Sequence, residues 1–262
     1  MTLAACEWIF GARPLEGIVG VLAHGRYDAL EITGEPGRKD AERLLCLVDR
    51  AGLQISGCTA NCERPERDLA HPERELRQLA VGYYRGCVDL VGRLGGRTVG
   101  LIPSAEGRLA PLTSYEREWQ LAVEAAREVA RHAAGRGVAL AVEALNRYET
   151  FLVNRVEQAL AFADEVGVDG VGIAADLFHM NIEEGDPQAA LEQAGPHLRE
   201  LHVADSNRRG LGRGHLPLER LLAAAGDTPL VVEVTAPDAA ELDEYVVESA
   251  SIVRALRRVD VR

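Results

Sequence analysis

Short apolar runs alternate with longer amphipathic segments from one end of the chain to the other. The apolar runs have the length and composition of β-strands, and the longer segments repeat apolar residues three and four positions apart, which is typical of a helix with one buried face. Trp119, Val123, Ala126 and Ala130 form one such stripe. The expected strands are 3–10, 28–33, 53–57, 98–102, 138–143, 171–176, 201–203 and 230–234. The clearest helices are expected at 14–23, 40–51, 72–94 and 239–256, with two more around 119–130 and 156–167.

Eight strand–helix pairs in strict alternation indicate an α/β fold with a parallel sheet that closes into a (β/α)8 TIM barrel. The length of 262 residues suits one such domain, so residues 1–262 are expected to form a single catalytic barrel. A doubly wound open sheet is the alternative. It is disfavoured because no glycine-rich phosphate-binding turn follows the first strand.

The last four strands share one pattern. In the strand at 138–143, bulky residues alternate with Ala139, Ala141 and Glu143, so the small and polar side chains share a face. The bulky face of a barrel strand must point toward the helices, which leaves the other face for the barrel interior. The following strands carry a polar residue on that same face, near their carboxyl ends: Asp176, His202 and Glu233.

Three carboxylates and one imidazole that converge in this way predict a site for one divalent metal ion. Any one of these acids alone could be a core residue whose hydrogen bonds are all made. Because four such side chains lie on the same face of their strands, a bound ion is favoured. A bound ion would act as a Lewis acid toward a sugar carbonyl. Glu143 and Glu233 come from the fifth and eighth strands, so they could flank a substrate as base and acid on opposite faces.

The loops after these strands are polar. His179 lies three residues past Asp176 and could bind a substrate hydroxyl, or could be a packing residue. Arg208 lies six residues past His202 and could donate to substrate oxygens, or could be a solvated charge at the rim. Glu183, Glu184 and Asp186 are expected at the start of the next helix, where negative charge is favourable.

Charge and composition restrict the partners. The chain has 29 basic and 41 acidic residues, a net charge of −12, which disfavours binding to nucleic acid. No apolar stretch approaches the ~20 residues that span a bilayer, and the first residues lack the features of a signal peptide. The five cysteines are sparse, and Cys58 and Cys62 have no second Cys or His pair at zinc-finger spacing. Reduced thiols and a cytoplasmic location are therefore expected.

Three stretches carry a family resemblance: 142–150 (VEALNRYET), 176–184 (DLFHMNIEE) and 202–208 (HVADSNR). Through them the chain resembles the xylose-isomerase-like superfamily of sugar isomerases and epimerases, and within it the ketose 3-epimerases that act on tagatose, allulose, ribulose or keto-gluconate. Weaker matches occur at 31–36 and 71–72. The similarity covers most of the chain and is dense from about residue 138 to 235. Leu177 departs from the usual Thr, Leu211 departs from a common Pro, and the first four strand ends match poorly.

The resemblance implies roles for individual residues. Glu143, Asp176, His202 and Glu233 would bind the metal, and Glu143 and Glu233 would also exchange protons with the substrate. Glu149, His179 and Arg208 would contact substrate oxygens. The ion would be Mn²⁺, with Co²⁺ or Mg²⁺ as alternatives. The partner would be a sugar or keto-sugar, and a homodimer or homotetramer is expected.

The expected function is a metal-dependent sugar epimerase or isomerase that inverts C3 of a ketose or keto-sugar acid through a cis-enediolate. A metal-dependent lyase on the same scaffold, either a keto-inositol dehydratase or a subunit of a carbon-glycoside deglycosidase, remains open. So does a non-catalytic sugar-binding protein. An endonuclease of the same superfamily is disfavoured, because it would need further histidines at the third and fourth strand ends, where the chain has Cys58–Asn61 and Ile102–Ser104.

Overall fold

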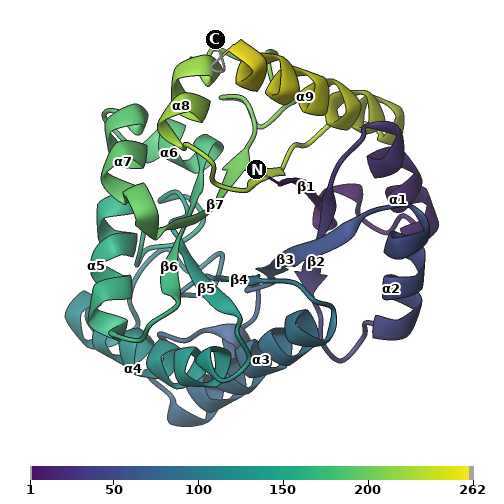
Figure 1. Cartoon of the computed structure of the whole chain (residues 1–262). Helices are drawn as coiled ribbons and strands as arrows, with labels where there is room; N and C mark the ends of the chain where they lie inside the picture. The colour runs from purple at the N-terminus through teal and green to yellow at the C-terminus, as the bar shows by residue number, and fades with distance from the viewer. Residues whose placement is uncertain (1, 260–262) are drawn as a thin grey trace.

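Eight parallel strands close into a barrel in the order β1 to β8, with β1 paired to both β2 and β8 (Figure 1). The structure is a computed structural model that describes residues 2–259. The strands are β1 (Leu3–Cys6), β2 (Ala29–Gly34), β3 (Gln54–Ala60), β4 (Thr98–Leu101), β5 (Ala139–Glu143), β6 (Val171–Asp176), β7 (Leu198–Val203) and β8 (Leu230–Val232). This arrangement confirms the predicted (β/α)8 barrel.

Helices surround the barrel on all sides (Figure 1). They are α1 (Leu15–His24), α2 (Ala41–Arg50), α3 (Arg74–Arg93), α4 (Tyr115–Ala134), α5 (Val156–Val166), α6 (Leu177–Glu183), α7 (Pro187–Ala194), α8 (Leu218–Ala224) and α9 (Ala239–Val259). Short 3-10 turns lie at Trp8–Phe10, Pro65–Arg67 and Gly195–His197. The first and last helices, α1 and α9, pack side by side and close the ring. None of the helices within residues 2–259 combines the length and apolarity that a membrane span needs.

Local sequence signals set several helix ends. Asp40 precedes α2 and accepts a hydrogen bond from the backbone N–H of Arg43 at 3.0 Å. Ser114 does the same for α4, accepting from the N–H of Arg117 at 3.2 Å. These side chains satisfy N–H groups that have no partner inside the helix. Gly167 ends α5 in the left-handed region, with φ of 64°, where glycine has no steric cost.

The barrel interior is lined by small side chains. The main core lies between the strands and the helices, whereas Ala4, Cys6, Ala29 and Val231 form a separate buried cluster inside the barrel. Because small residues occupy the inward face, polar side chains can share this interior near the carboxyl ends of the strands. The expected division into a bulky outer face and a small or polar inner face is therefore present.

The structure differs from the expected elements at four strands. β3 continues three residues past its expected end, to Ala60, and β8 ends at Val232, two residues early; the first and seventh strands affect the site. β1 ends at Cys6, and the apolar residues Trp8–Phe10 form a 3-10 turn instead of continuing the strand. The Glu7 side chain accepts from the N–H of Thr33 at 2.9 Å, which ties the turn to β2. β7 begins at Leu198, three residues before the expected start, so Glu200 belongs to the strand.

An additional helix, α6, occupies the segment that was expected to be a polar loop after the sixth strand. Asp176 caps it by accepting a hydrogen bond from the N–H of Phe178 at 2.7 Å. The assignment of three acids to the next helix is right only for Asp186, which caps α7. Glu183 instead pairs with Arg147 at 2.8 Å, and Glu184 accepts from the N–H of Val156 at 2.8 Å. Both side chains therefore connect α6 to the segment after β5.

Candidate active site

Four side chains meet at the carboxyl ends of β5 to β8. Glu143 and Asp176 are the last residues of their strands, His202 lies in β7, and Glu233 follows β8 directly. Each is at most 4% exposed. The Nδ1 atom of His202 lies 2.9 Å from Glu233 Oε2 and 3.2 Å from Glu143 Oε1. The structure thus brings together the four residues that the alternation of side chains along the strands predicted.

The four side chains fit a single divalent ion. One ligand atom from each lies within 4.8 Å of all the others. Ligands at 2.0–2.6 Å from a common ion lie no more than about 5 Å apart. Asp176 Oδ2 is buried and has no hydrogen-bond partner among the described residues. An orphaned carboxylate oxygen in an O,O,O,N cluster is what a metal site requires before the ion is bound.

The charged side chains of the cluster strongly shift one another's pKa values. Burial alone would lower the pKa of His202, but the carboxylates of Glu143 and Glu233 outweigh it and raise that pKa well above its usual value. Burial likewise tends to raise the pKa of Glu233, yet Arg208 and His202 bring it well below the ordinary range. Burial raises the pKa of Asp176 to about 6, against the opposing effect of His179 and Arg208. The site concentrates negative charge that a cation would neutralise.

Arg208 reaches from the loop after β7 back over this cluster. Its guanidinium lies 3.1 Å from Glu233 Oε1 and 3.7 Å from Asp176 Oδ2. The guanidinium carbon lies 5.4 Å from the ring centre of Trp8 and 4.8 Å from that of Phe178. Carboxylates and aromatic faces thus hold its position. Arg208 also has a φ of 58°, a left-handed conformation that non-glycine residues seldom adopt.

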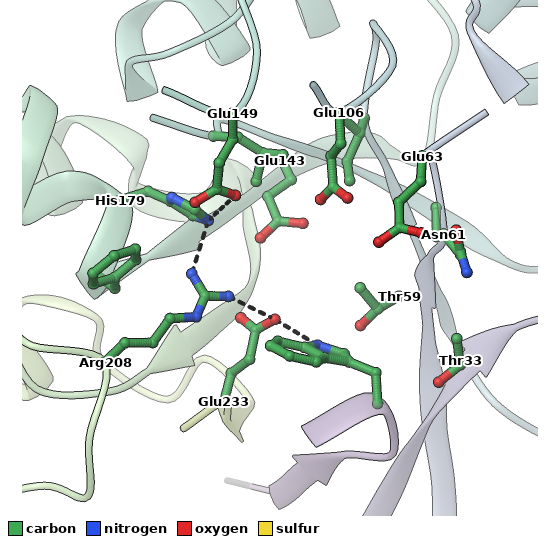
Figure 2. Close-up of a pocket in the computed structure, with 15 residues that line it drawn as sticks. Thr33, Thr59, Asn61, Glu63, Glu106, Glu143, Glu149, His179, Arg208 and Glu233 are labelled. Atoms are coloured by element: carbon green, nitrogen blue, oxygen red, sulfur yellow. Dashed lines mark hydrogen bonds and ion pairs between the residues drawn. The ribbon is translucent and has the colours of Figure 1, made fainter. Parts of the chain in front are cut away.

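His179 lies in helix α6, so its expected position in a loop is wrong. The backbone N–H of Asn146 donates to its Nδ1 at 3.2 Å, and its Nε2 faces the cluster. That atom lies 3.5 Å from Asp176 Oδ2, 3.9 Å from Glu149 Oε2 and 3.3 Å from Arg208 Nη1. The Asn146 side chain also donates to Glu149 Oε1 at 2.7 Å. The three predicted substrate contacts therefore adjoin one another, as Figure 2 shows.

A cavity of about 380 Å³ opens above the cluster. Glu143, Glu149, His179, Arg208 and Glu233 line it on one side (Figure 2). Six further lining residues were not predicted from the sequence. Trp8 lies beside Glu233 and Arg208, and the others line the rest of the cavity: Thr33, Thr59, Asn61, Glu63 and Glu106. They come mainly from turns and loops after β1 to β4, where no repeated pattern marks a functional side chain.

Trp8 and Glu106 are the most informative of the residues that were missed. The indole N–H of Trp8 donates to Glu233 Oε1 at 2.7 Å. Burial, reinforced by Glu143 and Glu149, raises the pKa of Glu106 to about 7. Trp8 is expected within the first strand, and its actual position in the 3-10 turn brings it to the cavity. Glu106 lies in an irregular loop that gives no spacing signal.

Two buried acids lie deeper in the barrel. Glu31 in β2 and Glu200 in β7 are 1% and 3% exposed. The alternation of side chains could have identified Glu31, since Ala29, Glu31 and Thr33 alternate with bulky residues as in the later strands, whereas Glu200 lay outside the expected seventh strand. Cys6, Glu31 and His202 also place ligand atoms within 4.8 Å of one another. Neither this group nor the main cluster, within residues 2–259, contains a histidine from the third or fourth strand end.

Residues 21–256 match the xylose isomerase-like TIM barrel family. The chain belongs to that family. It is 34% identical over 167 residues to the D-psicose 3-epimerase of Ruminiclostridium cellulolyticum, an alignment that covers 62% of this chain and 56% of the relative. It is 26% identical over 202 residues to the 3-dehydro-D-guloside 4-epimerase of Escherichia coli, covering 74% of this chain and 76% of the relative.

The ketose 3-epimerase relatives extend beyond the matched region. The chain spans about half of their length, 56% of the first and 53% of an L-ribulose 3-epimerase from Mesorhizobium japonicum. The fold agrees over nearly the whole chain with the crystal structure of D-psicose 3-epimerase with D-tagatose from Clostridium cellulolyticum. The TM-score is 0.88 at 23% identity, and the match covers 98% of this chain and 99% of that one.

Proposed function

We propose that this protein is a metal-dependent sugar epimerase that inverts C3 of a ketose. Glu143 and Glu233 would exchange protons with the substrate through a cis-enediolate. The observation that carries the proposal is the position of these two carboxylates. Glu143 ends β5 and Glu233 directly follows β8; the two lie 3.2 Å and 2.9 Å from His202 Nδ1 and line the same cavity.

The names of the relatives support this chemistry. In a ketose such as D-psicose the carbonyl is at C2, so a 3-epimerase inverts the carbon beside it. In a 3-dehydro sugar the carbonyl is at C3, so a 4-epimerase again inverts its neighbour. Both reactions remove a proton from a carbon next to a carbonyl and return it on the other face. Two carboxylates on opposite sides of the substrate are suited to that task.

A divalent ion bound by Glu143, Asp176, His202 and Glu233 would polarise the carbonyl and acidify the adjacent C–H. Mn²⁺ suits this mixed donor set, and Co²⁺ or Mg²⁺ are alternatives. Arg208 and His202 outweigh the effect of burial and hold the pKa of Glu233 well below the usual range, so this carboxylate is ionised and would act as the base, although a weaker one than an ordinary carboxylate. Glu143 would return one on the opposite face.

Arg208, His179 and Glu149 would orient the substrate. The guanidinium and the imidazole of His179 lie at the cavity beside the reacting groups, where they can bind sugar oxygens (Figure 2). Donors aimed at an oxygen that gains negative charge stabilise the enediolate more than the ketose. Glu149 can accept from a sugar hydroxyl.

The acidity of the cavity favours an uncharged ketose over a keto-sugar acid or a sugar phosphate. Five carboxylates line it: Glu63, Glu106, Glu143, Glu149 and Glu233. Among the described residues, Glu63 and Glu106 form no ion pair, and they lie opposite Arg208 (Figure 2). An anionic group at that end would meet two carboxylates, whereas hydroxyl groups could donate to them. The barrel would act as one catalytic domain, in a homodimer or homotetramer.

The decisive test is incubation with a panel of ketoses, keto-acids and glycosides in D₂O with Mn²⁺, followed by NMR. Solvent deuterium should enter at C3 of a neutral ketose as that carbon inverts. Label at C1 or C2 would indicate an aldose–ketose isomerase. Release of water or an aglycone would indicate a lyase, and binding without any label would indicate a non-catalytic protein.

A further inference from the structure

Glu31 is a buried carboxylate with no role in the proposed proton transfer. It is 1% exposed, on the inward face of β2, and it is not among the residues that line the cavity. It therefore lies beneath the cluster and not beside the substrate. An ionisable group in such a place is costly unless it has polar partners, so its contacts indicate its purpose.

Those contacts point to His202. The hydroxyl of Thr59 donates to Glu31 Oε1, and the thiol of Cys6 donates to the same atom at 3.5 Å. His202 Nε2 lies 3.5 Å from Glu31 Oε1 and 4.0 Å from Glu200 Oε1, so Glu31 is the nearer carboxylate. Glu31 Oε2 and His202 Nε2 are both buried without a hydrogen-bond partner among the described residues. His202 Nε2 therefore lacks an acceptor, and Glu31 is the carboxylate nearest to it.

The opposite nitrogen of the same ring, Nδ1, faces Glu143 and Glu233. An imidazole that binds a cation through Nδ1 must carry its hydrogen on Nε2. Metal-binding histidines usually donate that hydrogen to a carboxylate or carbonyl, which fixes the ring and increases the basicity of the ligating nitrogen.

We infer that Glu31 is a positioning residue that accepts the Nε2–H of His202 and holds the imidazole with Nδ1 directed at the metal site. This inference rests on the proposed metal dependence. Glu31 would support the metal site without touching the substrate or the ion. It lies in β2, in the half of the barrel that contributes none of the four predicted ligands.

Cys6, Glu31 and His202 could instead bind a second ion, since their ligand atoms also lie within 4.8 Å of one another. One feature disfavours it. His202 belongs to both groups, and ions on both of its nitrogens would require the imidazole to lose both protons.

The inference is tested by titrating the metal-free full chain with Mn²⁺, using calorimetry for Kd and elemental analysis for stoichiometry. Glu31→Leu leaves Nε2 without an acceptor, and Kd should rise by about 10- to 100-fold, the usual effect of losing such a partner. Glu31→Gln keeps an amide oxygen as acceptor and should restore most of the affinity. Cys6→Ala is the matched control and should bind like the wild type. Thermal unfolding of the metal-free variants separates affinity from folding.

The outcomes are distinct. If the wild type binds no ion, the proposed function fails, and this inference with it. If the wild type binds one ion and Glu31→Leu binds it equally well, the inference alone is overturned. Two ions in the wild type and one in Cys6→Ala would establish the second site instead. Should Glu31→Leu not fold, ¹⁵N–¹H correlation of His202 in the Mg²⁺-loaded wild type decides, because a proton on Nδ1 would overturn the inference.

Discussion

The two halves of the barrel contribute differently to the cavity. Strands β5 to β8 supply all four predicted metal ligands at their carboxyl ends, together with His179 and Arg208 just beyond. Strands β1 to β4 lead into turns and loops that supply Trp8, Asn61, Glu63 and Glu106. Side chains of the second half contact one another closely, whereas Glu63 and Glu106 form no ion pair within residues 2–259. The predicted metal ligands are thus tied to the ends of regular strands, whereas the cavity-lining residues of the first half lie mainly on irregular segments.

The largest effect is expected from the second half, for Asp176→Asn. The loss of one anionic ligand should weaken Mn²⁺ binding by more than about 100-fold, since outer partners of a metal site alone are worth 10- to 100-fold. Turnover should fall with it. Asparagine can still cap α6, so circular dichroism should show an intact barrel. Metal content in the variant equal to that of the wild type would show that an ion is held elsewhere.

The second-largest effect is expected for Arg208, whose side chain reaches over the predicted metal site. Arg208→Ala should reduce turnover by about 10²- to 10³-fold, the usual loss for a donor that stabilises a developing oxyanion. Its metal content should not decrease, because Arg208 is assigned to the substrate. Arg209 is the adjacent, exposed arginine, and Arg209→Ala is the matched control, with near-normal turnover. Equal rates for the two variants would make Arg208 an ordinary surface charge.

A smaller effect is expected from the first half, in stability instead of catalysis. In the metal-free protein, burial and the neighbouring acids raise the pKa of Glu106 from about 4.5 to about 7. The folded state then binds more protons than the unfolded state between these values, so stability falls as pH rises through that window. Glu106→Gln removes this loss, and at pH 8 it should raise the free energy of unfolding by up to about 3 kcal/mol.

Urea denaturation at pH 4 and pH 8 checks this last prediction. At pH 4 the carboxyl group is mostly protonated in both states, so the Glu106→Gln variant and the wild type should be similar. Glu124→Gln is the control, because Glu124 is exposed on α4 away from the cavity and should change stability at neither pH. A Glu106→Gln variant that is no more stable at pH 8 would mean that this side of the cavity is better solvated than its burial implies.

The sequence predicted regular features better than irregular ones. Eight strands and the shared parity of Glu143, Asp176, His202 and Glu233 followed from alternation, which is a direct consequence of strand geometry. Helix α6 was missed because it is one short segment whose start depends on the Asp176 cap, a local contact that the polar stretch 178–184 did not reveal.

Other residues were missed because an expected strand began too late or because the chain leaves regular structure. Glu200 was not recognised because β7 was started three residues late. Trp8 became part of the site only because the chain turns after Cys6, and the alternation of apolar residues cannot show such a turn. Glu106 depends on the path of an irregular loop. The positions of these residues at or below the cavity are therefore visible only in the three-dimensional structure.

The left-handed backbone at Arg208 has a consequence for protein engineering. Conformations of this kind cost a non-glycine residue on the order of 1–3 kcal/mol. Glycine at position 208 would relieve that cost, so a search for stabilising substitutions guided by backbone geometry would select this position. The same change would remove the guanidinium from the cavity. It would also leave the buried carboxylates of Glu233 and Asp176 without the cation that pairs with them, so the backbone conformation alone is a poor guide to stability at this position.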